Sequence, residues 1–267
     1  MTLDGETAHA GDAHLPFSIQ SISKVFTLAM TLESMDESLW DHVGREPSGT
    51  KFNSIVQLES EAGRPRNPLI NAGAIATTDR LIAQSDAETT INRVETFLQT
   101  LADDPAVNID RAVAESESAA GARNRSLAHF MSAFKNLSQP VETALRVYFH
   151  QCALSLSCAQ LARAGLFLAN DGRDPITGEQ VVSPKHCREI NAVMMLCGHY
   201  DNSGEFAVRV GLPGKSGVGG GILAIAPGQG AVAAWSPGLN DAGTSFAGSA
   251  ALEHFATAAG WSVFDAV

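Results

Sequence analysis

The sequence predicts an α+β fold in which a small antiparallel sheet, built from both chain ends, encloses a large helical insert. Apolar residues recur at helical spacing through the middle of the chain, and no fixed-period repeat or low-complexity linker divides it. Short runs of β-branched or small residues follow near the C-terminus, where Gly228-Gln229-Gly230 favours a hairpin. We therefore predict one domain with two lobes: residues 1–20 plus about 200–267 form a sheet lobe, and about 21–199 form a mostly helical lobe.

The elements follow in chain order. A helix is predicted from Phe17 onward because Val25, Leu28, Ala29 and Leu32 have helical spacing before the polar stretch at residues 33–38. Residues 47–68 are rich in Ser, Gly, Asn and Pro and are typical of loops. Further segments have helical patterns, namely residues 72–82, 91–101, 126–134, 141–148, 158–168 and 186–196. Strands are predicted at 206–211, 221–226 and 231–235, and a helix at about 244–259 closes the chain on the sheet.

Composition restricts the class of partner. The formal net charge of -11 and the absence of a basic run disfavour nucleic acid, so a small-molecule partner is expected. The most apolar segment, residues 217–238, is broken by glycines and prolines and favours a hairpin over a membrane helix. The four cysteines lack CxxC spacing, which suggests neither a zinc site nor a disulfide framework and fits reduced thiols. Residues 1–12 lack a secretory pattern, so a cytoplasmic protein is expected. We expect no metal and no cofactor.

Ser21 and Lys24 form an SxxK pattern that places a lysine on the same helical face as a serine. A lysine there can act as a base if burial lowers its pKa. The same spacing occurs at Ser48 with Lys51, in a turn composition, and at Ser132 with Lys135, late in a helical run. Only Ser21 begins an apolar helix, where free backbone N–H groups stabilise an anion. N-capping by Ser18, Ser21 or Ser23 is the structural alternative.

A second element, Lys215-Ser216-Gly217-Val218, precedes an apolar strand and can line a cleft that faces a nucleophile. A nucleotide-binding loop is excluded because Arg209 occupies the position of its first glycine and a strand follows where a helix is needed. A glycine-rich strand entry that only permits close packing remains the alternative.

With both elements, the sequence resembles the serine-dependent glutaminases, which share the fold and SxxK logic of penicillin-binding proteins and serine β-lactamases. The resemblance extends from Leu3 to about Gly248. It is carried by blocks in family order: Phe17 to Val25, Pro47-Ser48-Gly49 with Phe52-Asn53-Ser54, Arg66 to Ala74, Ser116-Glu117 with Arg123-Asn124, Tyr148 with Gln151-Cys152, Gly198-His199-Tyr200, and Val210 to Gly221.

The resemblance implies hydrolysis of L-glutamine to L-glutamate and ammonia through an ester on Ser21. It implies that Lys24 is the general base and Tyr200 its partner in proton transfer, and leaves open which of the two removes the Ser21 proton. It further implies a homodimer or homotetramer without a cofactor. The implied substrate ligands are Asn71, Glu117, Asn124, Tyr148, Tyr200 and the backbone N–H groups of Ser21 and Val218. By themselves, Glu117 would be a solvated helix residue and Asn71 an N-cap.

Two alternatives stay open: a serine acyl hydrolase of the penicillin-binding or β-lactamase kind, and a glutamine-binding pseudoenzyme. The second arises because family members carry more chain before the first block. Thr2 to Glu6 resembles the turn between the first two strands. A first strand, the helix before it and a tyrosine near the substrate carboxylate are therefore expected to be missing, with weakened stability and a raised KM.

Overall fold

The computed structural model describes residues 1–48, 55–83 and 85–265. Its helices are α1 (Ser23–Met35), α2 (Ile55–Ser60), α3 (Asn71–Ile82), α4 (Ala87–Ala102), α5 (Arg111–Ala119), α6 (Ala122–Ala133), α7 (Val141–Cys152), α8 (Cys158–Ala169), α9 (Pro184–Cys197), α10 (Ser203–Arg209) and α11 (Phe246–Ala259). The strands are β1 (Phe17–Ser18), β2 (Asn108–Ile109), β3 (Leu154–Leu156), β4 (Gly214–Ser216), β5 (Gly221–Ala226) and β6 (Gly230–Trp235). Short 3-10 turns lie at Gln20–Ile22 (η1), Asp36–Asp41 (η2) and Tyr200–Asn202 (η3).

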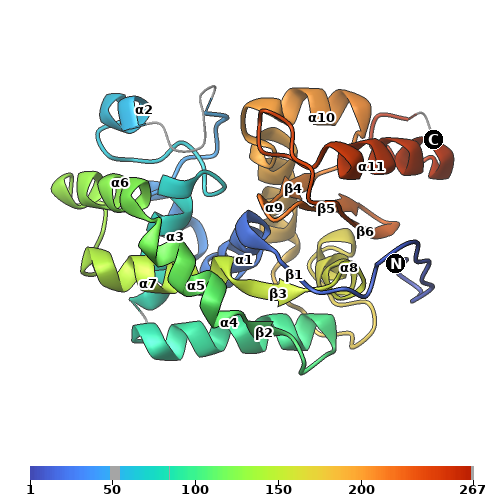
Figure 1. Cartoon of the computed structure of the whole chain (residues 1–267), viewed down its shortest axis with the longest axis horizontal. Helices are drawn as coiled ribbons and strands as arrows, with labels where there is room; N and C mark the ends of the chain where they lie inside the picture. The colour runs from blue at the N-terminus through green and yellow to red at the C-terminus, as the bar shows by residue number, and fades with distance from the viewer. Residues whose placement is uncertain (49–54, 84, 266–267) are drawn as a thin grey trace.

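The C-terminal sheet has the order β4-β5-β6, and all its pairs are antiparallel. Side chains of β5 alternate between its two faces, as the period of a strand requires. Leu223 and Ile225 pack with α8 in the main core, whereas Ile222 and Ala224 join Leu252 of α11 in a second cluster. The sheet therefore lies between α8 and α11, at the opposite end of the molecule from α2 and α6 (Figure 1).

Both chain ends contribute to this sheet lobe, but in different ways. The backbone of Met1 to Leu3 runs beside β6: Ala231 N–H donates to Met1 O at 3.0 Å, and Leu3 N–H donates to Gln229 O at 3.1 Å. Phe17–Ser18, in contrast, pairs with β3 in a second three-stranded sheet of order β1-β3-β2. The predicted contribution of both ends thus holds for residues 1–3, while β1 belongs to the other sheet.

Helix α1 is the centre of the main core, with Phe26, Leu28 and Leu32 fully buried against α3, α7 and α9. The start of α3 is held close by Gly73, since a Cβ at this position would lie 1.8 Å from Asn67 O. The Asn67 side chain accepts hydrogen bonds from the backbone N–H groups of Leu69 and Ile70, both at 3.0 Å. These contacts fix where Asn71, the first residue of α3, meets α1.

Most predicted helices are present, and α3 and α8 begin and end within one residue of the prediction. Helices α4 and α6 begin four residues earlier than expected and α7 ends four residues later, while α2 and α5 were not predicted. None of the helices in the described ranges combines the length and hydropathy needed to cross a bilayer.

The predicted strand at residues 206–211 is wrong, because Ser203–Arg209 forms helix α10. The short run of β-branched and small residues favoured a strand, but Val208 is 84% exposed while Phe206 and Val210 are buried against Leu252. Phe206 and Val210 lie four residues apart and share one helical face. The Ser203 hydroxyl also bonds the backbone just before α10, accepting from His199 N–H and donating to Tyr200 O.

Asp79, near the end of α3, is fully buried and anchors the segment that leads into α7. Its carboxylate accepts from Gln139 N–H at 2.7 Å and from both the N–H and the hydroxyl of Ser138, and it pairs with Arg80 at 3.1 Å. Since α7 carries Tyr148, this anchor also fixes one wall of the site described below.

We predict that Asp79→Ala lowers the free energy of unfolding by about 3–5 kcal/mol, because it leaves the buried Arg80 guanidinium and two backbone N–H groups without their acceptor. Urea denaturation followed by circular dichroism measures the change. The control is Glu88→Gln, which breaks a solvent-exposed ion pair with Arg146 and should cost less than about 1 kcal/mol. Equal losses in the two variants would contradict the anchoring role.

Candidate active site

Ser21 lies in the 3-10 turn η1 immediately before α1, with 8% of its surface exposed. The preceding residue, Gln20, has a φ of 50°, in the left-handed region that non-glycine residues rarely adopt. No side chain caps η1 or α1: the Ser18 hydroxyl donates to Cys152 O at 2.9 Å and the Ser23 hydroxyl to Gln20 O at 2.7 Å. The capping interpretation of these serines is therefore wrong, and Ser21 instead shares a hydrogen bond with Tyr200.

Lys24 is buried one turn along from Ser21, with 1% of its surface exposed. Its ammonium donates to Asn71 Oδ1 at 2.7 Å and to Leu69 O at 3.2 Å. Burial lowers the pKa of Lys24 to about 8, although the nearby Cys152 and Glu117 partly oppose the shift. A neutral amine is therefore available close to physiological pH.

Tyr200, the first residue of η3, lies between two buried lysines. The Lys24 Nζ is 5.6 Å from the centroid of its ring, and the Lys215 Nζ is 4.3 Å from the same centroid. Burial raises the pKa of Tyr200 above its ordinary value, and the hydrogen bond with Ser21 partly offsets this effect. The φ of Tyr200 is 58°, so a strained backbone holds this side chain as well.

Lys215 on β4 is fully buried, and its ammonium donates to Gly198 O at 2.9 Å and to Ser216 O at 2.6 Å. Burial and the charge of Lys24 hold the pKa of Lys215 well below its ordinary value. The sequence identified the Lys215-Ser216-Gly217 element as cleft-lining but did not place its lysine against Tyr200. The contact between a fully buried lysine and a buried tyrosine can be recognised only from the tertiary structure.

The loop after β4 packs tightly on the segment that carries Ser21. A Cβ at Gly217 would lie 2.4 Å from Ile19 O, and one at Gly219 would lie 2.3 Å from Ser18 O. Trp235 supports the same loop, since its Nε1–H donates to Gly219 O at 2.9 Å and its ring stacks on Phe17. Between these glycines, Val218 is 44% exposed, and its backbone N–H donates no hydrogen bond within the described residues.

The other predicted ligands converge from α3, α5, α6 and α7. Asn71 extends the hydrogen-bond chain that starts at Lys24, because its Nδ2–H donates to Asn124 Oδ1 at 3.0 Å. Tyr148 is buried with its ring centroid 5.9 Å from the Lys24 Nζ. Glu117 on α5 is half-buried, and its charge raises the pKa of Lys24 and of Tyr148. The helices that carry Lys24 and these ligands pack against one another, namely α1, α3, α5, α6 and α7 (Figure 1).

Two buried groups beside the site were not assigned from sequence. Burial raises the pKa of the Cys152 thiol to about 11, and this thiol lies close to Tyr148 and Ser23. His199 stacks on Phe206 with ring centroids 3.7 Å apart, and burial holds its pKa well below the ordinary value. Both residues fell in the sequence blocks around Tyr148 and Tyr200, but nothing in their spacing indicated a role.

The two other SxxK matches do not form comparable sites. Ser132 lies in the last turn of α6 and Lys135 follows its end, and both are exposed. Ser48 is buried, but Lys51 lies outside the described residues, as does the Phe52-Asn53-Ser54 block.

Fold and site together define an α+β protein with a buried serine, lysine and tyrosine at the junction of its helices and C-terminal sheet. The glutaminase family model matches residues 1–264. A glutaminase from Agrobacterium fabrum is 60% identical over 265 residues, 99% of this chain and 86% of that protein. A thermolabile glutaminase from Rhizobium etli is 59% identical over 99% of this chain and 85% of its own length. The chain belongs to the glutaminase family.

Solved structures agree with this assignment. The probable glutaminase ybaS superposes with a TM-score of 0.94 at 40% identity, over 99% of this chain and 85% of that one. The Bacillus subtilis glutaminase YbgJ, in covalent complex with 5-oxo-L-norleucine formed by reaction with 6-diazo-5-oxo-L-norleucine, superposes with a TM-score of 0.88 at 32% identity. That match covers 99% of this chain and 87% of the other.

We predict that Gly217→Ala lowers kcat/KM for glutamine by tenfold or more, because the new Cβ must push the Val218 loop away from Ile19 and Ser21. Displacements of about 1 Å at a reacting centre can cost ~100-fold in rate. Gly238→Ala is the matched control, since nothing lies within 4 Å of its added Cβ, and it should leave kinetics unchanged. Wild-type kinetics in Gly217→Ala would show that close approach of this loop is not required.

Proposed function

We propose that the protein hydrolyses L-glutamine to L-glutamate and ammonia, with Ser21 as nucleophile. The observation that carries this proposal is the hydrogen bond between Ser21 and Tyr200 next to Lys24, whose pKa is lowered to about 8. A serine hydroxyl needs an adjacent base to become a nucleophile, and both neighbours can move a proton. The YbgJ glutaminase forms a covalent complex with 5-oxo-L-norleucine, which supports the presence of a nucleophile in a related protein.

The reaction has two steps. In the first, Ser21 Oγ attacks the side-chain carbonyl carbon of glutamine and its proton passes to Lys24 or Tyr200. That proton is then delivered to the amide nitrogen as the C–N bond breaks, which releases ammonia and leaves a glutamyl ester on Ser21. The backbone N–H groups of Val218 and Ser21 stabilise the developing oxyanion. In the second, water attacks the glutamyl ester on Ser21, which releases glutamate and restores the hydroxyl. A cofactor has no part in either step.

Substrate recognition follows from the charges and donors around Ser21. The half-buried Glu117 carboxylate pairs with the α-ammonium of glutamine, while Asn71, Asn124 and the hydroxyls of Tyr148 and Tyr200 bond the remaining polar groups. A peptide bond at either end of the glutamine would remove the charge that these groups recognise. Free glutamine is therefore the preferred substrate.

Lys24 is the better candidate for the base. Its pKa of about 8 leaves part of the amine neutral at physiological pH, whereas burial moves the pKa of Tyr200 further from that range. Tyr200 then passes the proton between Ser21 and Lys24, in agreement with its position next to both groups. The Lys215 Nζ also lies 4.3 Å from the ring centroid of Tyr200, and its ammonium, when protonated, favours the transient phenolate.

We propose one glutaminase domain of β-lactamase and transpeptidase type, with a sheet lobe of residues 1–20 plus about 200–267 and a helical lobe between them. A cytoplasmic homodimer or homotetramer is included in this proposal. Hydrolysis of a β-lactam is the second function compatible with a buried SxxK serine and a KSG element, and a chromogenic β-lactam assay distinguishes it.

We predict that 6-diazo-5-oxo-L-norleucine labels Ser21 covalently and that Ser21→Ala abolishes both labelling and ammonia release. Intact-mass spectrometry and peptide mapping identify the labelled residue, and ammonia release from glutamine is assayed in parallel. Ser132→Ala is the matched control, because this exposed serine also stands three positions before a lysine. Labelling at a residue other than Ser21, or turnover by Ser21→Ala, would exclude the proposed nucleophile.

We predict that kcat/KM for glutamine, which reports the pKa values of the free enzyme, rises with pH through an apparent pKa near 8, because the base form of Lys24 is the deprotonated one. Tyr200→Phe should lose activity and keep this inflection, whereas Lys24→Ala should lose both. Circular dichroism of each variant confirms that it folds. An inflection near pH 8 that persists in Lys24→Ala would assign the titration to another group and exclude Lys24 as the base.

A further inference from the structure

The far ends of α1 and α9 meet at a second cluster of charged side chains. Helix α1 spans 13 residues from the site to Met35, so its two ends lie roughly 18–20 Å apart. Helix α9 packs against α1, and its C-terminal end leads through Gly198 and His199 to Tyr200. The cluster is therefore remote from Ser21, yet it joins the two helices that carry Ser21, Lys24 and Tyr200 at or near their other ends.

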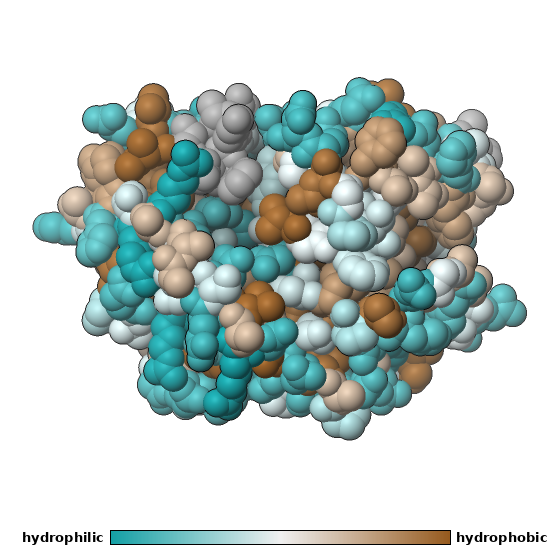
Figure 2. All heavy atoms as spheres, viewed as in Figure 1, coloured by the Kyte–Doolittle hydropathy of each residue, from teal (hydrophilic) through white to brown (hydrophobic). Residues whose placement is uncertain are grey.

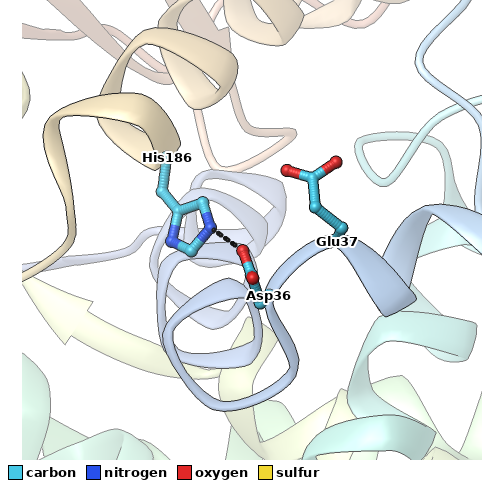
Figure 3. Close-up of side chains that lie close together, drawn as sticks. All are labelled: Asp36, Glu37 and His186. Carbon is cyan, nitrogen blue, oxygen red and sulfur yellow. Dashed lines mark hydrogen bonds and ion pairs between the residues drawn. The ribbon is translucent and has the colours of Figure 1, made fainter.

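Asp36, Glu37 and His186 form this cluster (Figure 3). His186 Nε2 lies 2.9 Å from Asp36 Oδ1, and one potential ligand atom from each of the three side chains lies within 4.8 Å of the others. The two carboxylates are exposed at the surface, while the histidine is buried. Glu37 forms an ion pair with Lys185, so its carboxylate must exchange that partner before all three groups can bind one ion.

His186, a member of the cluster, has a second ring nitrogen that faces Glu33. It is only 6% exposed, and its Nδ1 atom is buried without a hydrogen-bond partner. The same nitrogen lies 3.8 Å from Glu33 Oε2, one turn earlier on α1. Histidines that bind metals through one ring nitrogen commonly donate from the other to a carboxylate. Glu33 occupies the place of that carboxylate, which gives the unpartnered Nδ1 a role.

The local charge also favours a cation. Glu33, Asp36 and Glu37 stand at the C-terminal end of α1, where the helix dipole is negative, and the last turn of α1 has no basic residue. Lys185 supplies one positive charge through its ion pair with Glu37, but both side chains are about half exposed. This ion pair leaves two of the three carboxylates without a cation of fixed charge.

We propose that Asp36, Glu37 and His186 form a site for a divalent transition-metal cation of the zinc class, completed by water. Imidazole and carboxylate ligands suit this class, with bonds of about 2.0–2.2 Å. On binding, His186 carries its proton on Nδ1 and donates it to Glu33, while the metal replaces Lys185 as the partner of Glu37. The expectation of no metal rested on cysteine spacing and did not consider this cluster. The site joins α1 to α9 and takes no part in the hydrolysis.

The test is titration of the untagged, chelator-treated full chain with Zn²⁺ by isothermal calorimetry, and with Co²⁺ by visible absorption. We expect one saturable site and Co²⁺ ligand-field bands. Glu37→Gln should weaken binding at least tenfold, and Glu33→Gln should weaken it about 10–100-fold, as loss of an outer-shell partner does. Lys185→Gln should tighten binding, because it removes the competing ammonium. Both carboxylates are exposed enough that these variants test the ligands without disturbing the core.

Two controls make the result specific. Glu179→Gln alters an exposed carboxylate elsewhere and should leave the affinity unchanged. His9→Gln removes one ring of the His9–His14 pair, in which two imidazoles approach with centroids 4.6 Å apart, and should also leave the affinity unchanged. Absence of saturable binding at millimolar Zn²⁺, an unchanged affinity in Glu37→Gln, or loss of binding only in His9→Gln would overturn the proposal. Since metal binding is measured directly, the result is independent of glutaminase activity.

Discussion

The candidate site depends on burying two lysine ammonium groups against one tyrosine ring. Lys24 and Lys215 are both withdrawn from water and lie 5.6 and 4.3 Å from the centroid of Tyr200. Removing amines from water lowers their pKa values, and their mutual repulsion adds to this effect for Lys215. Carbonyl oxygens of Leu69, Gly198 and Ser216 accept their hydrogen bonds, so the surrounding backbone compensates for part of the lost hydration.

This arrangement explains why the fold brings distant segments so close together. Helix α1 supplies Lys24, β4 supplies Lys215, and the turn between α9 and α10 supplies Tyr200. Gly73 and Gly217 allow backbones to approach where any larger residue would collide. The packing of α3 and of the loop after β4 on the α1 segment is therefore a condition for the chemistry as well as for stability.

The sequence indicated where the elements lie better than it indicated which side chains meet between them. The serine at the start of an apolar helix and the β5–β6 hairpin were predictable from spacing and turn composition, since both are local signals. Residues 206–211 were assigned to a strand from their β-branched and small side chains, a composition that a short helix can share. The burial of Phe206 and Val210 against Leu252 identifies the helix. No local pattern encodes the long-range contacts of Tyr200 with Lys215 and with Ser21. The same holds for the burial of His186, whose Nδ1 has no hydrogen-bond partner.

Trp235 connects the sheet directly to the loop that borders the site. Its indole N–H is bonded to Gly219 O while its ring stacks on Phe17, four residues before Ser21. An indole reports changes in its polarity and hydrogen bonding through its fluorescence. Trp235, one of three tryptophans in the chain, is therefore an intrinsic optical reporter on the Val218 loop, and changes in that loop can be followed without an added label.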